Sequence, residues 1–343
     1  MSVLLFKVIL IVLIFLISLG LAAYATYGER KVAAFLQDRI GPDRAGPFGL
    51  LQPIADGVKM FLKEEIIPTV SDKFLFILGP SLFMVTALMT SAVIPWGTPM
   101  EFGGVSYPLQ VADINIGILY VLGVVSLGIY GIMLGGWSSN NKYALLGAIR
   151  ASSQMISYEL AMGMSVIAVL LMTDGSLSLN VIVEGQKGLN WNVFYQPVAA
   201  LIFIITAFAE CNRTPFDLPE SESELIGGYH TEYSSMKLGL YLFAEYVNMF
   251  ISSAVISSLF FGGYNFPGLE YLQTVLPTNL VSLISFGVFF GKILFFIFFF
   301  MWVRWTIPRF RYDQLMRLGW QVLMPLAIIN VLITGAVITF FGN

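Results

Sequence analysis

Three carboxylates lie in stretches of the chain that are otherwise apolar. Glu159, Glu210 and Glu245 each fall inside, or at the end of, a run that approaches the roughly 20 apolar residues needed to cross a bilayer core. A charge at the bilayer centre costs about 2.5–3.5 kcal/mol on insertion scales, so these groups must face one another, water or a partner protein. Carboxyl groups held away from water are candidates for taking up and releasing protons, which predicts a proton relay.

A structural ion pair is the alternative interpretation of these charges. Lys292 lies in another apolar run, and a pair between Glu245 and Lys292 would hold two helices together. Asp113 and Asn115 add polar groups at the start of a further run. The relay is favoured, and the ion pair remains open.

An acidic segment follows Glu210. Between residues 211 and 237 the chain has two basic residues, Arg213 and Lys237, against five acidic ones: Asp217, Glu220, Glu222, Glu224 and Glu232. Pro215 and Pro219 suggest a segment of defined shape. A solvated surface loop is the alternative, and the residues alone leave both open.

The composition requires membrane-spanning helices to position these groups. Of the 343 residues, 57% are hydrophobic and only 11% are charged, against roughly 25% charged residues in globular proteins. This excludes a soluble enzyme, a disordered chain and a nucleic-acid-binding protein, which needs a basic surface. One cysteine, Cys211, and one histidine, His230, are too few for an iron–sulfur centre, which takes about four thiolates, and they do not favour haem ligation.

Eight apolar segments are predicted to cross the membrane, which makes residues 1–343 a single, all-α polytopic membrane domain. Gly131 and Gly135, like Gly287 and Gly291, are four residues apart and predict close helix approach, with chance as the alternative in a chain of 32 glycines. The spans are expected at about 3–23, 74–96, 114–136, 155–173, 193–210, 238–262, 282–303 and 320–341.

The distribution of lysine and arginine predicts the orientation in the membrane. Only Lys7, Lys187 and Lys292, of the 18 basic residues, lie outside four of the connecting loops. By the positive-inside rule these loops face the cytoplasm and both termini face outward. The four loops are 24–73, 137–154, 211–237 and 304–319.

The first cytoplasmic loop is predicted to contain an amphipathic helix on the membrane surface. Asp56, Lys59 and Lys63 alternate with apolar residues at helical spacing, and Pro68 follows the expected end. A simple connecting segment is the alternative. The apolar residues are Leu51, Ile54, Val58, Phe61, Leu62 and Ile66.

Oppositely charged neighbours also cluster in this loop, at Glu29-Arg30-Lys31, Asp38-Arg39 and Asp43-Arg44. Such groups can form the polar mouth of a mostly apolar cavity. Ordinary charges flanking a span are the alternative.

Three long strings in these cytoplasmic loops carry a family resemblance. They are GERKVAAFLQDRIGPDRAGPFGLLQPIADGVKMFLKE (28–64), AECNRTPFDLPESESELIGGYHTEYSSMK (209–237) and RWTIPRFRYDQLMRLGW (304–320). The chain resembles, over essentially its whole length, the family of H subunits of bacterial NADH:quinone oxidoreductase, respiratory complex I, which is related to mitochondrial subunit one.

The resemblance implies a subunit of the proton-translocating complex in the bacterial inner membrane, inactive alone. It would form the membrane part of the quinone chamber and couple quinone reduction to proton translocation. NADH, FMN and the iron–sulfur clusters would belong to partner subunits, and this chain would bind no metal or cofactor. The expected partners are peripheral-arm quinone-site subunits, antiporter-like membrane subunits, quinone and membrane lipid, with no nucleic acid.

The resemblance also implies roles for individual residues. None is expected to be catalytic, because a partner subunit would protonate the quinone headgroup; a catalytic role for His230 is therefore not expected. The chamber residues would be Glu29, Arg30, Arg39, Asp56, Lys59, Arg304, Arg309, Arg311 and Asp313. The proton or charge pathway would comprise Glu159, Glu210, Asp217, Glu220, Glu222, Glu224 and Glu245, with Lys292 as an addition that no motif supports.

Three other functions remain as alternatives at this stage. The homologous subunit of a membrane-bound hydrogenase or ferredoxin-linked complex would have the same fold. A stand-alone secondary transporter could use the same buried charges, but the two halves of the chain show no convincing repeat of the kind common in transporters. A passive assembly scaffold would use the charges only to hold partners.

Overall fold

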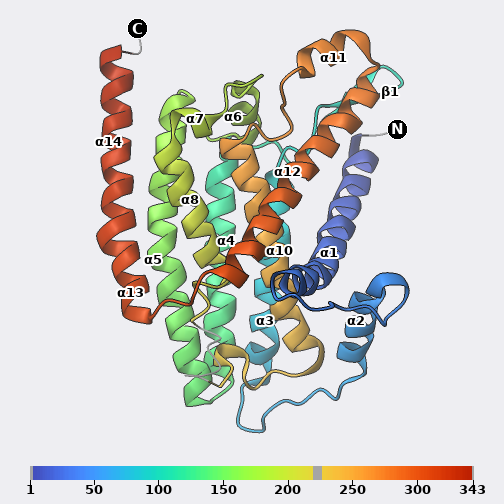
Figure 1. The fold of residues 1–343 in the computed structure, drawn as a ribbon, viewed down its shortest axis with the longest axis vertical. Helices are drawn as coiled ribbons and strands as arrows, with labels where there is room; N and C mark the ends of the chain where they lie inside the picture. The colour runs from blue at the N-terminus through green and yellow to red at the C-terminus, as the bar shows by residue number, and fades with distance from the viewer. Residues whose placement is uncertain (1–2, 219–225, 342–343) are drawn as a thin grey trace.

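Long helices dominate the computed structural model, which describes residues 3–218 and 226–341 (Figure 1). Seven helical segments are long and apolar enough to cross a membrane, which confirms the predicted all-α polytopic fold. They are α1 (Val3–Leu36), α3 (Lys73–Met89) with η2 (Thr90–Val93), α4 (Gly117–Ser138), α5 (Lys142–Met172), α10 (Ser235–Phe260), α12 (Thr278–Thr306), and α13 (Tyr312–Arg317) continuing through the π-helical η4 (Leu318–Leu323) into α14 (Met324–Phe341).

The fifth predicted span, 193–210, contains a shorter helix. Helix α8 (Pro197–Glu210) has 14 residues, which at about 1.5 Å per residue reach about 21 Å. This is less than the roughly 30 Å of a hydrocarbon core. The preceding α7 (Asn192–Tyr195) is followed by Gln196, and Pro197, which has no N–H to donate, begins the new helix.

Two helices extend well beyond the apolar stretches expected to span the bilayer. Helix α1 continues to Leu36, so Glu29 and Arg30 lie on a helix although 24–73 was predicted as a loop. Helix α5 begins at Lys142, inside the predicted loop 137–154, and the Asn141 side chain accepts a hydrogen bond from the Tyr143 N–H at its start. The difference arises because hydropathy marks the lipid-facing part of a helix, whereas backbone hydrogen bonding continues through its polar part.

The predicted amphipathic helix is present as α2 (Gln52–Leu62) and packs against α1 and α10. Ile54, Val58 and Phe61 are exposed along it, whereas Pro53 is buried. The chain leaves the helix after Leu62, because Lys63 has extended backbone. The helix thus offers apolar side chains on its outer face, as a helix lying on a membrane must.

Close helix contact distinguishes the two glycine pairs. A Cβ atom at Gly131 would lie 2.8 Å from the carbonyl oxygen of Gly79, so α3 and α4 could not pack as they do with a larger residue there. A Cβ atom at Gly135 would lie even closer to the Tyr241 hydroxyl on α10. In the described residues, no atom lies within 4 Å of a Cβ placed at Gly287 or Gly291, so the predicted close approach is confirmed for the first pair and wrong for the second.

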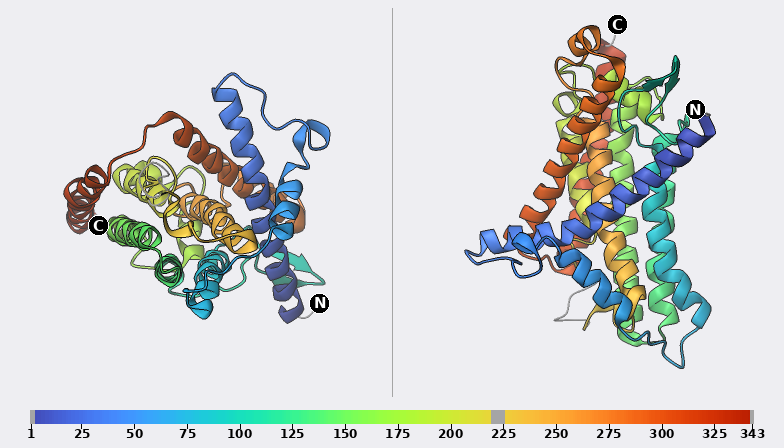
Figure 2. Two further views of the ribbon diagram at one scale, coloured as in Figure 1. Left: turned by 90° about the horizontal axis from the view of Figure 1, so that it is seen from below. Right: turned by 90° about the vertical axis from the view of Figure 1, so that its right-hand side faces the viewer.

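Short elements lie at both ends of the bundle. The end that holds Val3 and α14's last residues also has the antiparallel hairpin β1 (Met100–Phe102) and β2 (Val105–Tyr107), α6 (Leu179–Gly185), α7 and α11 (Leu269–Val275) (Figure 1). The opposite end has α2, η1 (Pro47–Gly49), η3 (Gly228–His230) and the segment after α8. Helices α1 and α14 lie on opposite sides of the bundle in both Figures 1 and 2. The charged loops therefore gather at one end.

Candidate functional site

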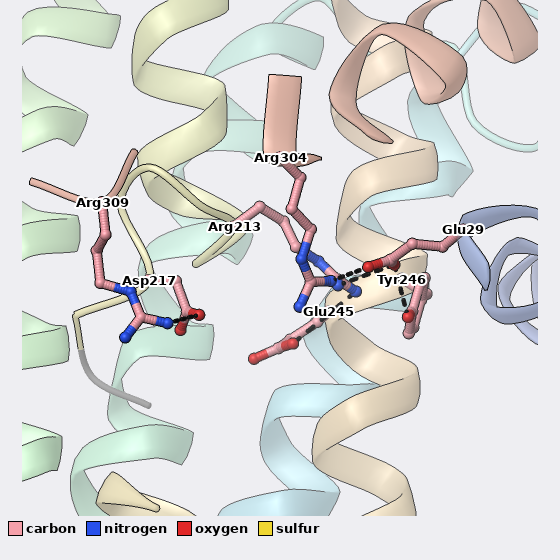
Figure 3. Close-up of polar contacts among 7 residues, drawn as sticks. All are labelled: Glu29, Arg213, Asp217, Glu245, Tyr246, Arg304 and Arg309. Atoms are coloured by element: carbon pink, nitrogen blue, oxygen red, sulfur yellow. Dashed lines mark hydrogen bonds and ion pairs between the residues drawn. The ribbon is translucent and has the colours of Figure 1, made fainter. Parts of the chain in front are cut away.

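A buried arginine lies at the centre of the charged cluster in Figure 3. Arg213 is 5% exposed and follows α8 directly. Its Nη1 lies 3.3 Å from Glu29 Oε2 on α1, and its Nη2 lies 4.0 Å from Glu245 Oε2 on α10. The guanidinium carbon is 4.0 Å from the ring centroid of Tyr246. One cation thus joins carboxylates from two helices.

Glu29 receives donors from three different elements. The Tyr246 hydroxyl donates to Glu29 Oε2 at 2.8 Å, and Arg304, in the last turn of α12, forms an ion pair with Oε1. Glu29 is only 6% exposed, so these donors replace the water that would otherwise solvate the carboxylate. The buried Arg213 and the half-buried Arg304 balance Glu29 and Glu245, which allows the two carboxylates to remain buried close together.

The surroundings of Arg213 keep it charged. Burial acts to lower the pKa of its guanidinium, but Tyr246, Glu29 and Glu245 together raise that pKa above its ordinary value. The side chain is therefore a permanent positive charge whose position, not protonation, can change.

Glu245 has a second partner besides Arg213. The Tyr229 hydroxyl, from η3, donates to Glu245 Oε1 at 3.1 Å, and Glu245 is 3% exposed. The described parts of the acidic segment, 211–218 and 226–237, therefore each contact Glu245 on α10.

A cavity of about 400 Å³ opens beside this cluster, between α1, α2, α10 and the end of α12. Arg213, Glu245 and Tyr246 line its inner wall, and Leu242 and Phe243 supply apolar surface. Six of the predicted chamber residues also line it: Glu29, Arg30, Arg39, Asp56, Lys59 and Arg304. Arg30 Nη1 contacts Asp56 Oδ2 at 2.8 Å, which connects α1 to α2 at the mouth.

The other predicted chamber residues do not line this cavity. Arg309 Nη2 contacts Asp217 Oδ2 at 2.9 Å, apart from the Arg213 cluster (Figure 3). Arg311 and Asp313 are exposed at the start of α13, where the Arg311 backbone N–H donates to the Gln314 side chain. They follow α12 in sequence, but the chain turns away from the cavity toward α14.

The predicted pathway residues occupy separate positions. Glu159 accepts a hydrogen bond from Ser126 and lines a second cavity, of about 480 Å³, between α4 and α5. Glu210 is the last residue of α8 and lies three residues before Arg213 in the sequence. Helix α8 packs on α5. Glu220, Glu222 and Glu224 lie outside the described residues. Within the described ranges 3–218 and 226–341, no hydrogen bond joins Glu159 to Glu210.

Lys292 does not pair with Glu245, so that alternative is wrong. Its Nζ donates to the carbonyl oxygens of Phe261, Gly263 and Asn265 at 2.7, 2.8 and 2.6 Å. It also lies 4.9 Å from the ring centroid of Trp191. The lysine therefore supplies hydrogen-bond donors to backbone carbonyl groups just after the end of α10. This position is at the opposite end of the bundle from Arg213.

The sequence interpretation missed Arg213, Tyr246 and Tyr229 as site residues. A usable signal for Arg213 was present, because it is a cation placed directly after a span that ends in a carboxylate. Tyr229 and Tyr246 carried no comparable signal. The chain has 15 tyrosines, and only packing selects those that reach a carboxylate.

Known proteins resemble this chain over nearly its full length. A family model described as NADH dehydrogenase matches residues 8–335. An H subunit of NADH-quinone oxidoreductase from Cytophaga hutchinsonii is 65% identical over 335 residues, covering 98% of this chain and 97% of the relative. The H subunit of Flavobacterium johnsoniae is 63% identical, covering 97% and 95%, and NADH-quinone oxidoreductase subunit 8 of Rhodothermus marinus is 48% identical, covering 94% of each.

Proposed function

We propose that this chain, which belongs to the NADH dehydrogenase family, forms the membrane wall of a quinone-binding chamber and couples quinone reduction to proton translocation. Family membership and the seven apolar helices make it a multi-pass membrane subunit of an NADH-quinone oxidoreductase, with other subunits of that complex as partners.

One observation carries the proposal: the 400 Å³ cavity ends on the buried cluster of Glu29, Arg213 and Glu245. Small-molecule sites are usually clefts of about 300–1,000 Å³ with apolar walls and a few polar groups that fix orientation. The apolar surface beside Phe243 suits the ring and tail of a quinone. The gap bounded by α1, α2 and α10 would give access from the lipid.

The orientation follows from the distribution of basic residues. The cavity lies at the end of the bundle with the loops 24–73, 211–237 and 304–319, which we assign to the cytoplasmic side. Electrons would reach the quinone from NADH through FMN and iron–sulfur clusters in partner subunits. The headgroup protons would also come from a partner, so this chain supplies the cavity and its charges.

Coupling would begin with a change of charge in the cavity. Electrons delivered by the partner subunits would leave negative charge on the quinone oxygens until the headgroup protons arrive. During that interval Arg213 and Arg304, the cations of the cluster, would be drawn toward the quinone. Two unit charges 4 Å apart interact by about 4 kcal/mol at an effective dielectric constant near 20. Displacing Arg213 from its 4.0 Å contact with Glu245 would therefore favour the protonated form of that carboxylate.

From Glu245 the change in protonation or charge would pass to the other acidic residues. Glu210 and Glu159 continue the set within the apolar helices. Asp217, Glu220, Glu222 and Glu224 belong to the acidic segment between α8 and α10. Antiporter-like membrane subunits of the complex would receive the change and move protons.

The experiment compares Glu245→Gln and Glu210→Gln complexes in proteoliposomes with wild type. We expect NADH oxidation by an artificial acceptor at the flavin to remain, whereas quinone-driven proton pumping falls by at least about tenfold, equivalent to about 1.4 kcal/mol. Asp174→Asn, which removes a carboxylate from the other end of the bundle, is the matched control. Wild-type quinone reduction and pumping in both Gln variants would refute the proposal.

A further inference from the structure

A further cavity, of about 800 Å³, lies at the end of the bundle opposite the Arg213 cluster. Its walls come from the β1–β2 hairpin, the end of α6, the segment after α10, α11 and the start of α12, which gather at one end in Figure 1. Three carboxylates line it, those of Glu101, Glu184 and Glu270, against the single cation Lys187. The lining is therefore acidic.

These carboxylates have few partners in the protein. Glu184 accepts a hydrogen bond from Asn180 Nδ2 at 3.1 Å. Among the described residues, the carboxylates of Glu101 and Glu270 have no hydrogen bond and Lys187 forms no salt bridge with any of the three. The negative charge of the cavity is thus not neutralised from within the described chain.

Tyr264 provides an independent sign of a ligand site. It lines the cavity and is only 5% exposed, yet its hydroxyl has no hydrogen-bond partner in the described part of the chain. The hydroxyl oxygen is not fully enclosed by protein, so it reaches the cavity, where a ligand can form a hydrogen bond with it. Burial, and next the charge of Glu184, raise the pKa of Tyr264, so the hydroxyl remains a neutral donor and acceptor beside that carboxylate.

The walls are held in place before any ligand arrives. Lys292 binds the carbonyl oxygens of Gly263 and Asn265, which flank Tyr264 on both sides. The Asn265 side chain donates to the Val183 carbonyl at 2.7 Å, next to Glu184. Asn279 exchanges two hydrogen bonds of 2.8 Å with the backbone of Glu101. A site fixed in this way loses little entropy on binding.

We propose that this cavity binds an elongated organic cation that carries two or more amino or guanidino groups. Carboxylates pair with such groups, and the rings of Tyr264 and Phe266 add surfaces that attract cations. The described residues contain no cluster of three or more His, Cys, Asp or Glu able to hold a metal ion. The three carboxylates come from three separate elements, β1, α6 and α11, which suits a ligand with charges spaced along a chain.

Two sources offer this chemistry: a free polyamine, or lysine and arginine side chains of a neighbouring polypeptide. Both place separated cations on a flexible aliphatic chain. With the orientation proposed above, the cavity faces the extracytoplasmic side, so either source would approach from there.

Binding of spermine to the purified complex in nanodiscs, measured by calorimetry, tests the first source. We expect the E101Q/E270Q variant to raise the Kd by about tenfold or more, and Tyr264→Phe to raise it several-fold, since each removes one class of contact. Asp174→Asn, at the same end but outside the cavity, should leave the Kd unchanged. The rate of NADH:quinone turnover should also be unchanged, so this result is separate from the proposed function.

Zero-length coupling of carboxylates to amines in native membranes tests the second source. A crosslink from Glu101, Glu184 or Glu270 to a lysine of a neighbouring polypeptide, suppressed by spermine, would identify a protein ligand. Spermine binding without a crosslink would identify a free polyamine. Equal spermine affinity of wild type and E101Q/E270Q, or neither binding nor a crosslink, would overturn the proposal.

Discussion

Two cations at opposite ends of the bundle, the buried Arg213 and the half-buried Lys292, have different kinds of partner. Arg213 contacts the side chains of Glu29, Glu245 and Tyr246, whereas Lys292 binds three backbone carbonyl oxygens. Side chains can exchange partners by rotation, but the carbonyl groups after α10 move only if the backbone moves. The comparison suggests that Arg213 is placed to respond to charge, and Lys292 to hold structure.

The largest expected effect follows from Arg213→Met. It leaves Glu29 and Glu245 buried with one cation fewer, and removing one partner of a buried pair typically costs about 3–5 kcal/mol. We expect poor assembly of the complex on native gels and loss of quinone-dependent NADH oxidation in what assembles. Arg213→Lys keeps the charge and should assemble. Normal assembly and turnover of Arg213→Met would remove the basis of the comparison.

Lys292→Met tests the other side of the comparison. It leaves buried carbonyl oxygens without their donor, at about 1–3 kcal/mol for an unsatisfied group, so the thermal unfolding temperature should fall. Protons pumped per NADH by the remaining folded complex should stay at the wild-type value. Lys292→Arg should restore part of the stability. A lower pumping ratio with unchanged stability would show that Lys292 belongs to the pathway after all.

Tyr246→Phe sharpens the account of the Arg213 cluster. The substitution removes the 2.8 Å hydrogen bond to Glu29 but keeps the ring beside the guanidinium. A bond to a charged acceptor contributes about 1.5 kcal/mol, so quinone turnover should fall by about tenfold at constant flavin activity. In Tyr246→Leu, which also removes the ring, quinone turnover should fall further. Equal rates in the two variants would assign the effect to the hydroxyl alone.

The smallest effect is expected for Arg309→Gln. Arg309 is 39% exposed in its pair with Asp217, and Asp217 does not depend on this partner alone. Solvent screening limits such pairs to about 0–1 kcal/mol, so stability should change little. Quinone turnover should stay within about twofold of wild type. A loss as large as that of Arg213→Met would extend the functional cluster to Asp217.

Much of the fold could be predicted from the sequence because hydropathy is a local property. The apolar runs, the amphipathic helix at Gln52–Leu62 and the close approach at Gly131 each follow from neighbouring residues. The length of α8 and the early start of α5 did not follow. Pro197 and Asn141 decide where those helices begin, whereas hydropathy windows average over such positions.

The candidate site was predictable only in part. Glu29, Asp56 and Arg304 carried the family resemblance and do line one cavity. Arg311 and Asp313 carried the same resemblance, yet they lie away from that cavity. Arg304 is in the last turn of α12, whereas Arg311 and Asp313 lie at the start of α13, after the chain has turned away from the cavity. Closeness in sequence therefore did not predict closeness in space.

The sequence by itself determined that the chain is a helical membrane protein, because so few charges and such long apolar runs are compatible with a lipid bilayer and not with water. Only the tertiary structure decided which charges meet. Arg213 and Glu29 are 184 residues apart, and Lys292 could have reached a carboxylate as readily as a helix end. A buried ion must find a partner, but which partner depends on how the helices pack around it.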